Sequence, residues 1–195
     1  MEEKRYSSEH GAKWKYSKAV AAMKLSALDE KKLWDLLTKY GESGWIAREV
    51  YDQQKSAHQA GDFAQMHAIA QSEVEAEIDT AFDESRSKHI RLMLSASPGF
   101  TMERNYEQAF ARVGESITPE QALPLALVFT EFYPSLTSRE MIPMLKQMNP
   151  ITGLMPIDEI AFKRLAEVLS ARQLDVFKSE KVRRNLTILN RNLYH

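Results

Sequence analysis

A chain of 195 residues, with 44% hydrophobic and 27% charged side chains, is long enough for one domain with a sizeable core or for two small helical lobes, and its composition is not that of a disordered or fibrous protein. It contains no cysteine, which excludes disulfides, thiolate metal sites and a cysteine nucleophile. The formal net charge of -1 favours no class of partner by itself.

Residues 1–25 are predicted to form a basic N-terminal tail, because six Lys or Arg residues oppose three Glu residues there. Lys13, Trp14, Lys15 and Tyr16 interleave charges with aromatic rings, a pattern that can hold phosphates and stack on bases. The alternative, which we favour, is a loosely helical segment from Ser8 that packs onto the rest of the protein. The charged N-terminus is unlike a signal peptide, so we expect a cytoplasmic protein.

Residues 26–195 are predicted to form a helical domain, either undivided or split into lobes at 26–96 and 100–195. A capping box at 26–29 begins a helix that we expect to end at Gly41, and a second helix is expected from about Gly44 to Ala60. A third begins at Asp62 and continues to about residue 94, with a break near 85–87. The sequence SASPGF (95–100) predicts a boundary, because Pro and Gly are adjacent there.

Further helices are expected from Thr101 to Gly114 and across the most apolar stretch, residues 118–149. Two segments of that stretch are similar in sequence, ITPEQALPLALVF (117–129) and LTSREMIPMLKQM (136–148). Each segment has a capping box and an interior proline, Pro124 or Pro143, so each helix is either kinked or restarted at its proline. A helix capped by Asp158 and a final pair from residue 170 complete an all-α fold of roughly eight antiparallel helices in a bundle or array.

Most chemistry-bearing motifs are missing from the chain. It has no nucleotide-binding glycine motif, no nucleophile elbow and no Glu-x-x-His pair, so we predict no catalytic residue, cofactor or metal site. The acidic residues of segment 73–84 flank an apolar stripe and are expected to face solvent. An enzyme or metal carrier built around His67, Glu73 and Glu77 is the least favoured hypothesis.

The C-terminal segment carries the sharpest functional signal. From residue 172 onward six basic side chains oppose two acidic ones, a net charge of 6 - 2 = +4, whereas residues 42–86 carry 3 - 10 = -7. The six are Arg172, Lys178, Lys181, Arg183, Arg184 and Arg191. Val182, Leu186, Leu189 and Leu193 repeat at helical spacing, and we expect them to form the apolar seam of an amphipathic helix, with the basic residues Lys181, Arg184 and Arg191 away from that seam.

Three short pieces, LTSRE (136–140), DEIA (158–161) and SARQLDVF (170–177), together resemble a response-regulator type helix-turn-helix. The resemblance covers about forty residues and implies DNA binding, with 170–177 as the recognition helix. The chain departs from that pattern at Pro143, inside the first helix, and in the long loop before residue 158.

Two functional hypotheses follow. The first is a non-enzymatic helical interaction or regulatory protein that acts through protein-protein contacts, with a protein partner or with itself. The second is a nucleic-acid-binding regulator that uses the six basic residues of the C-terminal helices. No apolar run approaches the roughly 20 residues of a membrane helix, so no membrane span is predicted.

Overall fold

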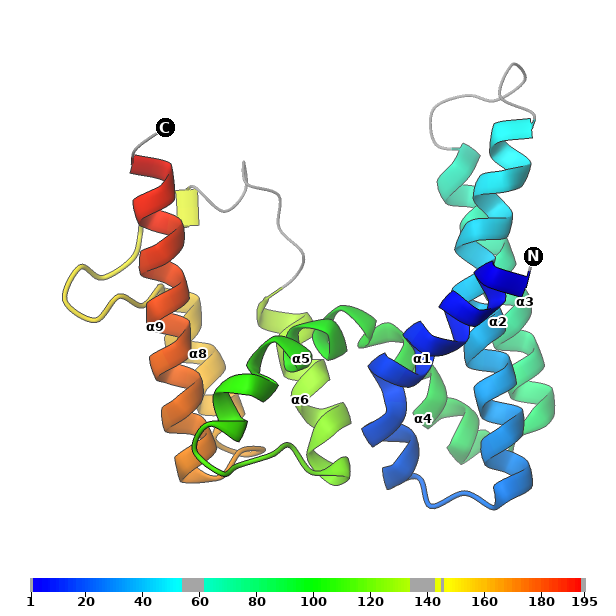
Figure 1. Cartoon of the computed structure of the whole chain (residues 1–195), viewed down its shortest axis with the longest axis horizontal. Coiled ribbons are helices and arrows are strands. Elements are labelled where there is room, and N and C mark those ends of the chain that lie inside the picture. Colours follow the sequence, from blue (N-terminus) through cyan, green and yellow to red (C-terminus); the bar gives the residue numbers. More distant parts are fainter. Residues whose placement is uncertain (1, 54–61, 134–142, 145, 194–195) are drawn as a thin grey trace. The chain divides into compact units, whose positions relative to one another are not determined.

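The computed structural model describes residues 2–53, 62–133, 143–144 and 146–193 (Figure 1). Within these ranges the protein is all-helical, as predicted, with eight helices and no strand. They are α1 (Glu2–Ala22), α2 (Ala27–Gln53), α3 (Asp62–Ala81), α4 (Glu84–Ser95), α5 (Ser97–Ala111), α6 (Pro119–Phe132), α8 (Pro156–Leu165) and α9 (Ala171–Leu193). In the same ranges, no helix has both the length and the hydropathy that crossing a bilayer requires.

The chain divides into two compact units, Met1–Leu94 and Ser95–His195. Residues 2–22 of the predicted basic tail form helix α1 of the first unit, in line with the favoured interpretation of a packed helical segment, although the helix begins before Ser8. Ala12, Tyr16, Ala19 and Val20 are buried on one side of α1, which packs against α2. Four-residue and three-residue spacing places these side chains on one helical face, which explains why the segment docks despite its charge.

Helix α2 is one continuous helix, so the predicted end at Gly41 and restart at Gly44 are wrong. Both glycines lie where a neighbouring helix approaches closely. A Cβ on Gly41 would lie 3.6 Å from the Cβ of Ser8 in α1, and one on Gly44 would lie 3.3 Å from Nε2 of His67 in α3. Packing on two sides therefore offsets the roughly 1 kcal/mol that an interior glycine costs a helix.

Helices α2 and α3 lie side by side as an antiparallel pair, and α4 follows a tight turn (Figure 1). The turn falls at Phe82 and Asp83, a few residues before the expected break. Asp83 caps α4, because its Oδ1 accepts a hydrogen bond from the Arg86 amide at 2.9 Å. Leu33, Leu37 and Ile78 are fully buried in the core of this unit.

In the second unit, α5 and α6 cross with their backbones in contact. Within the predicted boundary at 95–100, α4 ends and α5 begins at Ser97 rather than at Thr101, so that Pro98 and Gly99 lie in its first turn. Gly99 is needed for this crossing, since a Cβ there would lie only 1.8 Å from the carbonyl oxygen of Ala126. The Gly99 amide instead donates to Thr130 Oγ1 at 3.1 Å.

Helix α6 begins with the predicted capping box. The Gln121 amide donates to Thr118 Oγ1 at 3.3 Å, and the Thr118 amide donates to Gln121 Oε1 at 3.0 Å. The helix continues through Pro124, so the alternative in which the helix restarts at this proline is wrong. The second of the two similar segments, residues 136–148, falls largely outside the described residues.

A second capping box, at the start of α9, is joined to that of α6. The Gln173 amide donates to Ser170 Oγ, and the Ser170 amide donates to Gln173 Oε1 at 2.8 Å. The two glutamine side chains also meet, because Gln121 Nε2 donates to Gln173 Oε1 at 2.9 Å. Gln173 Nε2 donates to the Ser116 carbonyl at 2.7 Å, so this pair ties the starts of two helices together.

Candidate interaction surface

Helix α9 buries a face that differs from the predicted one. Its buried side chains are Gln173, Phe177, Lys181 and Asn185, at four-residue spacing. Phe177 lies among aromatic rings from three helices, with ring centroids 4.4 Å from Tyr106 and 5.4 Å from Phe129. The prediction that the apolar seam packs into the core is therefore wrong, because one aromatic residue and three hydrogen-bonded or ion-paired polar residues make the core contacts of α9.

Lys181 is buried as part of an ion pair. Only 8% of the residue is exposed, and its Nζ lies 3.4 Å from Oδ1 of Asp158, which is fully buried at the start of α8. Nζ also lies 4.1 Å from the ring centroid of Tyr133. Burial lowers the pKa of the Lys181 ammonium, and the Asp158 carboxylate opposes that shift. Lys181 thus lies on the packed side of α9, a position that the prediction gave to the apolar seam.

The second oxygen of Asp158 is saturated by hydrogen bonds. Oδ2 accepts from the Met155 amide at 2.8 Å and from Asn185 Nδ2 at 3.0 Å. Asn185 Nδ2 also donates to the Gly153 carbonyl at 3.0 Å. Helix α8 begins at Pro156, so Asp158 closes its first turn from inside the helix rather than preceding it as a cap. These bonds fix α8, α9 and the loop before α8 together.

Glu180 holds two of the predicted basic contact residues. Arg183 donates to both of its carboxylate oxygens, at 2.6 and 2.9 Å, and Arg184 Nε donates to Oε1 at 2.9 Å. The bond to Arg183, opposed by partial burial and helped by Arg184, lowers the pKa of Glu180 to about 2. Arg184 also donates to the Asn105 carbonyl at 2.6 Å and lies over the ring of Tyr106, so it binds α9 to α5.

The other predicted basic residues have separate positions. Arg172 is exposed, 3.9 Å from a carboxylate oxygen of Glu115, and Lys178 lies over the ring of Phe162. The Arg191 side chain lies outside the described part of the structure. Of the predicted cluster, Arg172 and Arg183 are the members that expose most of their side chains, about two thirds in each case.

The apolar residues of the predicted seam form a partly exposed ridge on α9. This ridge, which we call the α9 ridge, consists of Val182, Leu186 and Leu189. Leu186 is 42% exposed. One flank of the ridge contacts the turn before α8, where a Cβ on Gly153 would lie 2.9 Å from Val182 Cγ1. Ile151 in the same turn is 93% exposed.

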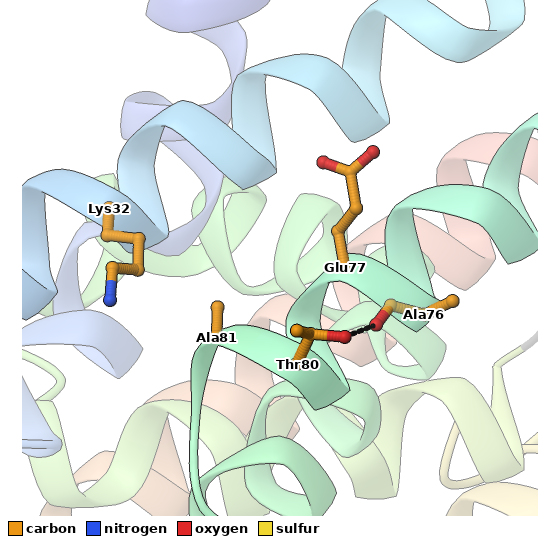
Figure 2. A pocket seen from close by; sticks show the side chains of 5 residues that line it. All are labelled: Lys32, Ala76, Glu77, Thr80 and Ala81. Atoms are coloured by element: carbon orange, nitrogen blue, oxygen red, sulfur yellow. Dashed lines mark hydrogen bonds between the residues drawn. The ribbon is translucent and has the colours of Figure 1, made fainter.

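The first unit contains a shallow, open groove between α2 and α3 (Figure 2). This α3 groove, of about 480 Å³, is lined by Lys32, Ala76, Glu77, Thr80 and Ala81. Figure 2 shows Lys32 projecting from α2 and the other four side chains along the adjoining turns of α3. The hydroxyl of Thr80 donates to the Ala76 carbonyl at 3.0 Å, which leaves its methyl group for contact with a ligand.

The acidic residues of α3 face outward, as predicted, and several pair with neighbouring helices. Glu77 pairs with Lys39 of α2, and Asp79 and Glu75 pair with Arg91 of α4. Among the described residues, no group of three or more acidic or histidine side chains is arranged to hold a metal ion. His67, one of the residues of the metal hypothesis, stacks instead on Phe63 with ring centroids 6.0 Å apart.

The aromatic and basic residues of the first helix do not share one surface. Tyr16 is buried, whereas Trp14 is 47% exposed. Lys13 forms an ion pair with Glu9 at 2.7 Å, and Lys15 Nζ lies 5.7 Å from the centroid of the Tyr16 ring. The proposed second nucleic-acid contact is thereby divided between the packed and solvent-facing sides of α1.

Two of the three segments that resemble a helix-turn-helix, residues 158–161 and 170–177, lie within the described residues. Residues 136–140 lie outside the described residues. In the pieces that are described, Asp158 is fully buried, and Gln173 and Phe177 of the expected recognition helix pack into the core of the second unit. No model of a known family, no curated protein and no solved structure matches the chain.

Proposed function

We propose that this is a non-enzymatic helical interaction protein whose α9 ridge binds another protein. The observation that carries the proposal is that Val182, Leu186 and Leu189 form a ridge on a helix anchored by other residues. Its core contacts are made by Phe177 and the Lys181 pair, so Leu186 stays 42% exposed between the half-buried Val182 and Leu189. Helical apolar side chains at this spacing are the usual anchors of helix-in-groove recognition.

The basic side chains beside the ridge support a protein partner more than a nucleic acid. A phosphate-binding face needs several free cations on one side, because each neutralised phosphate adds to affinity. Here Lys181 is paired with Asp158, and Arg183 and Arg184 both bind Glu180. Nucleic-acid binding by the C-terminal helices is the alternative, and its affinity would fall more steeply with added salt than docking on an apolar ridge with a few charges at its flank.

Site-specific photocrosslinking inside the cell of origin tests the proposal. A photoreactive amino acid replaces Leu186. A matched control protein carries the same group in place of Glu167, an exposed residue in the turn between α8 and α9. We expect position 186 to give a discrete protein adduct, identified by mass spectrometry, that position 167 does not give. Adducts to nucleic acid alone, or equal labelling from both positions, would contradict the proposal.

A further inference from the structure

The α9 ridge and the α3 groove have complementary shapes. The groove floor is made of small side chains, Ala76 and Thr80, which are exposed and let another helix approach closely. Along the same side of α3, Ile69 is 53% exposed. Ile69, Ala76 and Thr80 thus lie in one row along α3, as Val182, Leu186 and Leu189 lie in one row along α9.

Their charges are complementary as well. Helix α3 carries five acidic residues and no Lys or Arg, whereas α9 carries six basic residues and two acidic ones. Helical geometry places Glu73 and Glu77 on one flank of the groove floor. The same geometry places Arg172 and Arg183 on one flank of the ridge, where both side chains are about two thirds exposed.

We propose that the α3 groove of one copy of this chain binds the α9 ridge of a second copy. This inference rests on the proposed function, because it names the occupant of the same ridge. Leu186, the exposed member of the ridge, inserts over Ala76 and Thr80, which is helix packing of a large side chain into a groove of small ones. The arginine flank of the ridge lies against the glutamate flank of the groove, which fixes the orientation of the two helices.

Existing ion pairs do not oppose this contact strongly. Glu77 pairs with Lys39, and both side chains are about half exposed, so this pair contributes little stability and exchanges partners at small cost. Arg183 keeps its bond to Glu180, whose side chain is only 11% exposed, and turns its remaining guanidinium N–H groups toward the glutamates of the groove. Lys32, the one cation lining the groove, lies 5.8 Å from the Phe82 ring centroid and is held at the groove's edge.

Each copy carries one groove and one ridge. Two copies can satisfy both contacts reciprocally in a two-fold dimer, and a longer chain or ring of copies satisfies them in the same way. We therefore expect the purified full-length chain to show a mass-average size above that of a monomer, rising with concentration.

Sedimentation velocity of three full-length proteins tests the inference. The wild type should self-associate at low ionic strength. The double variant Glu73→Lys/Glu77→Lys and the double variant Arg172→Glu/Arg183→Glu should each associate at least tenfold more weakly. Mixing the two variants should restore association, because each then meets its opposite charge on the other chain. A wild type that stays monomeric, or a mixture that stays dissociated, would overturn the inference.

A matched control separates a specific contact from a general effect of charge. The double variant Glu131→Lys/Glu167→Lys changes the net charge by the same amount as Glu73→Lys/Glu77→Lys. Its two positions are exposed and lie at the end of α6 and just beyond the end of α8, where a cation suits the helix dipole. This variant should associate as the wild type does, and circular dichroism should give equal helicity for every chain. If the wild type stays monomeric but position 186 crosslinks to a different protein, the inference fails and the proposed function stands.

Discussion

Glu180 is the side chain through which acid acts most directly on the second unit. Its folded-state pKa of about 2 lies below the ordinary value of 4.5, so the unfolded chain binds more protons than the folded chain between these two pH values. Stability from its bonds to Arg183 and Arg184 is therefore complete above about pH 4.5 and is lost as the pH falls toward 2.

Glu180→Gln should therefore lower the free energy of unfolding at pH 7 by about 1 kcal/mol, a size expected for a partly exposed pair. The difference from the wild type should shrink steadily between pH 5 and pH 2. Urea unfolding followed by circular dichroism at several pH values measures both quantities. A difference that is constant with pH would mean that the carboxylate charge plays no part.

The buried pair of Asp158 and Lys181 should behave quite differently from an exposed one. Asp158→Ala leaves the Lys181 ammonium without its counter-charge and leaves the Met155 amide without its acceptor, which should cost about 3–5 kcal/mol. In the double variant Asp158→Ala/Lys181→Met no unpaired charge is left, so the loss should be smaller than the sum of the single losses. Thermal or urea unfolding of the four proteins gives the coupling energy, and strict additivity would contradict the pairing.

Lys181 also shows why the packed face of α9 was not predictable from its own sequence. A lysine in an amphipathic pattern indicates solvent, whereas Val182 and Leu186 indicate a core. The reversal depends on Asp158, which is 23 positions earlier in the chain and reaches Lys181 only once α8 has packed. Nothing in the local pattern marks that carboxylate as a buried partner.

At the scale of elements, close backbone approaches position the helices, and glycines permit them. Gly99→Ala should lower the free energy of unfolding by about 3 kcal/mol, because the added methyl group meets the Ala126 carbonyl and cannot be relieved by a side-chain movement. Gly11→Ala is the matched control, since a Cβ there has no atom within 4 Å. It should raise stability by about 0.5–1 kcal/mol through helix propensity. Chemical denaturation of both variants measures the contrast, which equal effects would refute.

Glycine is also where the prediction of helix boundaries succeeded and failed. Gly114 ends its helix region as expected and has a φ of +73°, a conformation that suits glycine. Gly41 and Gly44 were expected to interrupt α2, but they make room for α1 and α3. The two uses look identical in sequence, because only the neighbouring helix distinguishes them. Local capping signals, such as Thr118 with Gln121, were predicted correctly because they depend on four adjacent residues.

At the scale of the whole molecule, the two compact units should respond separately to damage. Asp158→Ala acts in the second unit, so amides of α6 and α9 should exchange with deuterium faster, while amides of α2 and α3 keep their protection. Hydrogen-deuterium exchange with mass spectrometry resolves these helices in one experiment. An equal loss of protection in both units would indicate that they unfold as one.

The helical class was predictable at this scale, because it needs only hydrophobic periodicity and the lack of alternating segments. The α3 groove was not, since its lining combines residues of two helices that are more than forty positions apart. The exposure of the α9 ridge was not predictable either. The spacing of its apolar residues could be recognised in the sequence, but the sequence did not indicate which side of α9 packs against the rest of the unit.

The joined capping boxes of α6 and α9 bear on how long the folded second unit lasts. Gln121 and Gln173 are 52 residues apart, so their bond can form only after the intervening chain has closed a long loop. Contacts of this kind tend to form late, after the rate-limiting step of folding. Gln173→Leu should therefore accelerate unfolding severalfold while changing the refolding rate little, as stopped-flow measurements would show. On that basis the glutamine pair slows the unfolding of the second unit and hardly affects its folding rate, so it determines how long the folded unit persists.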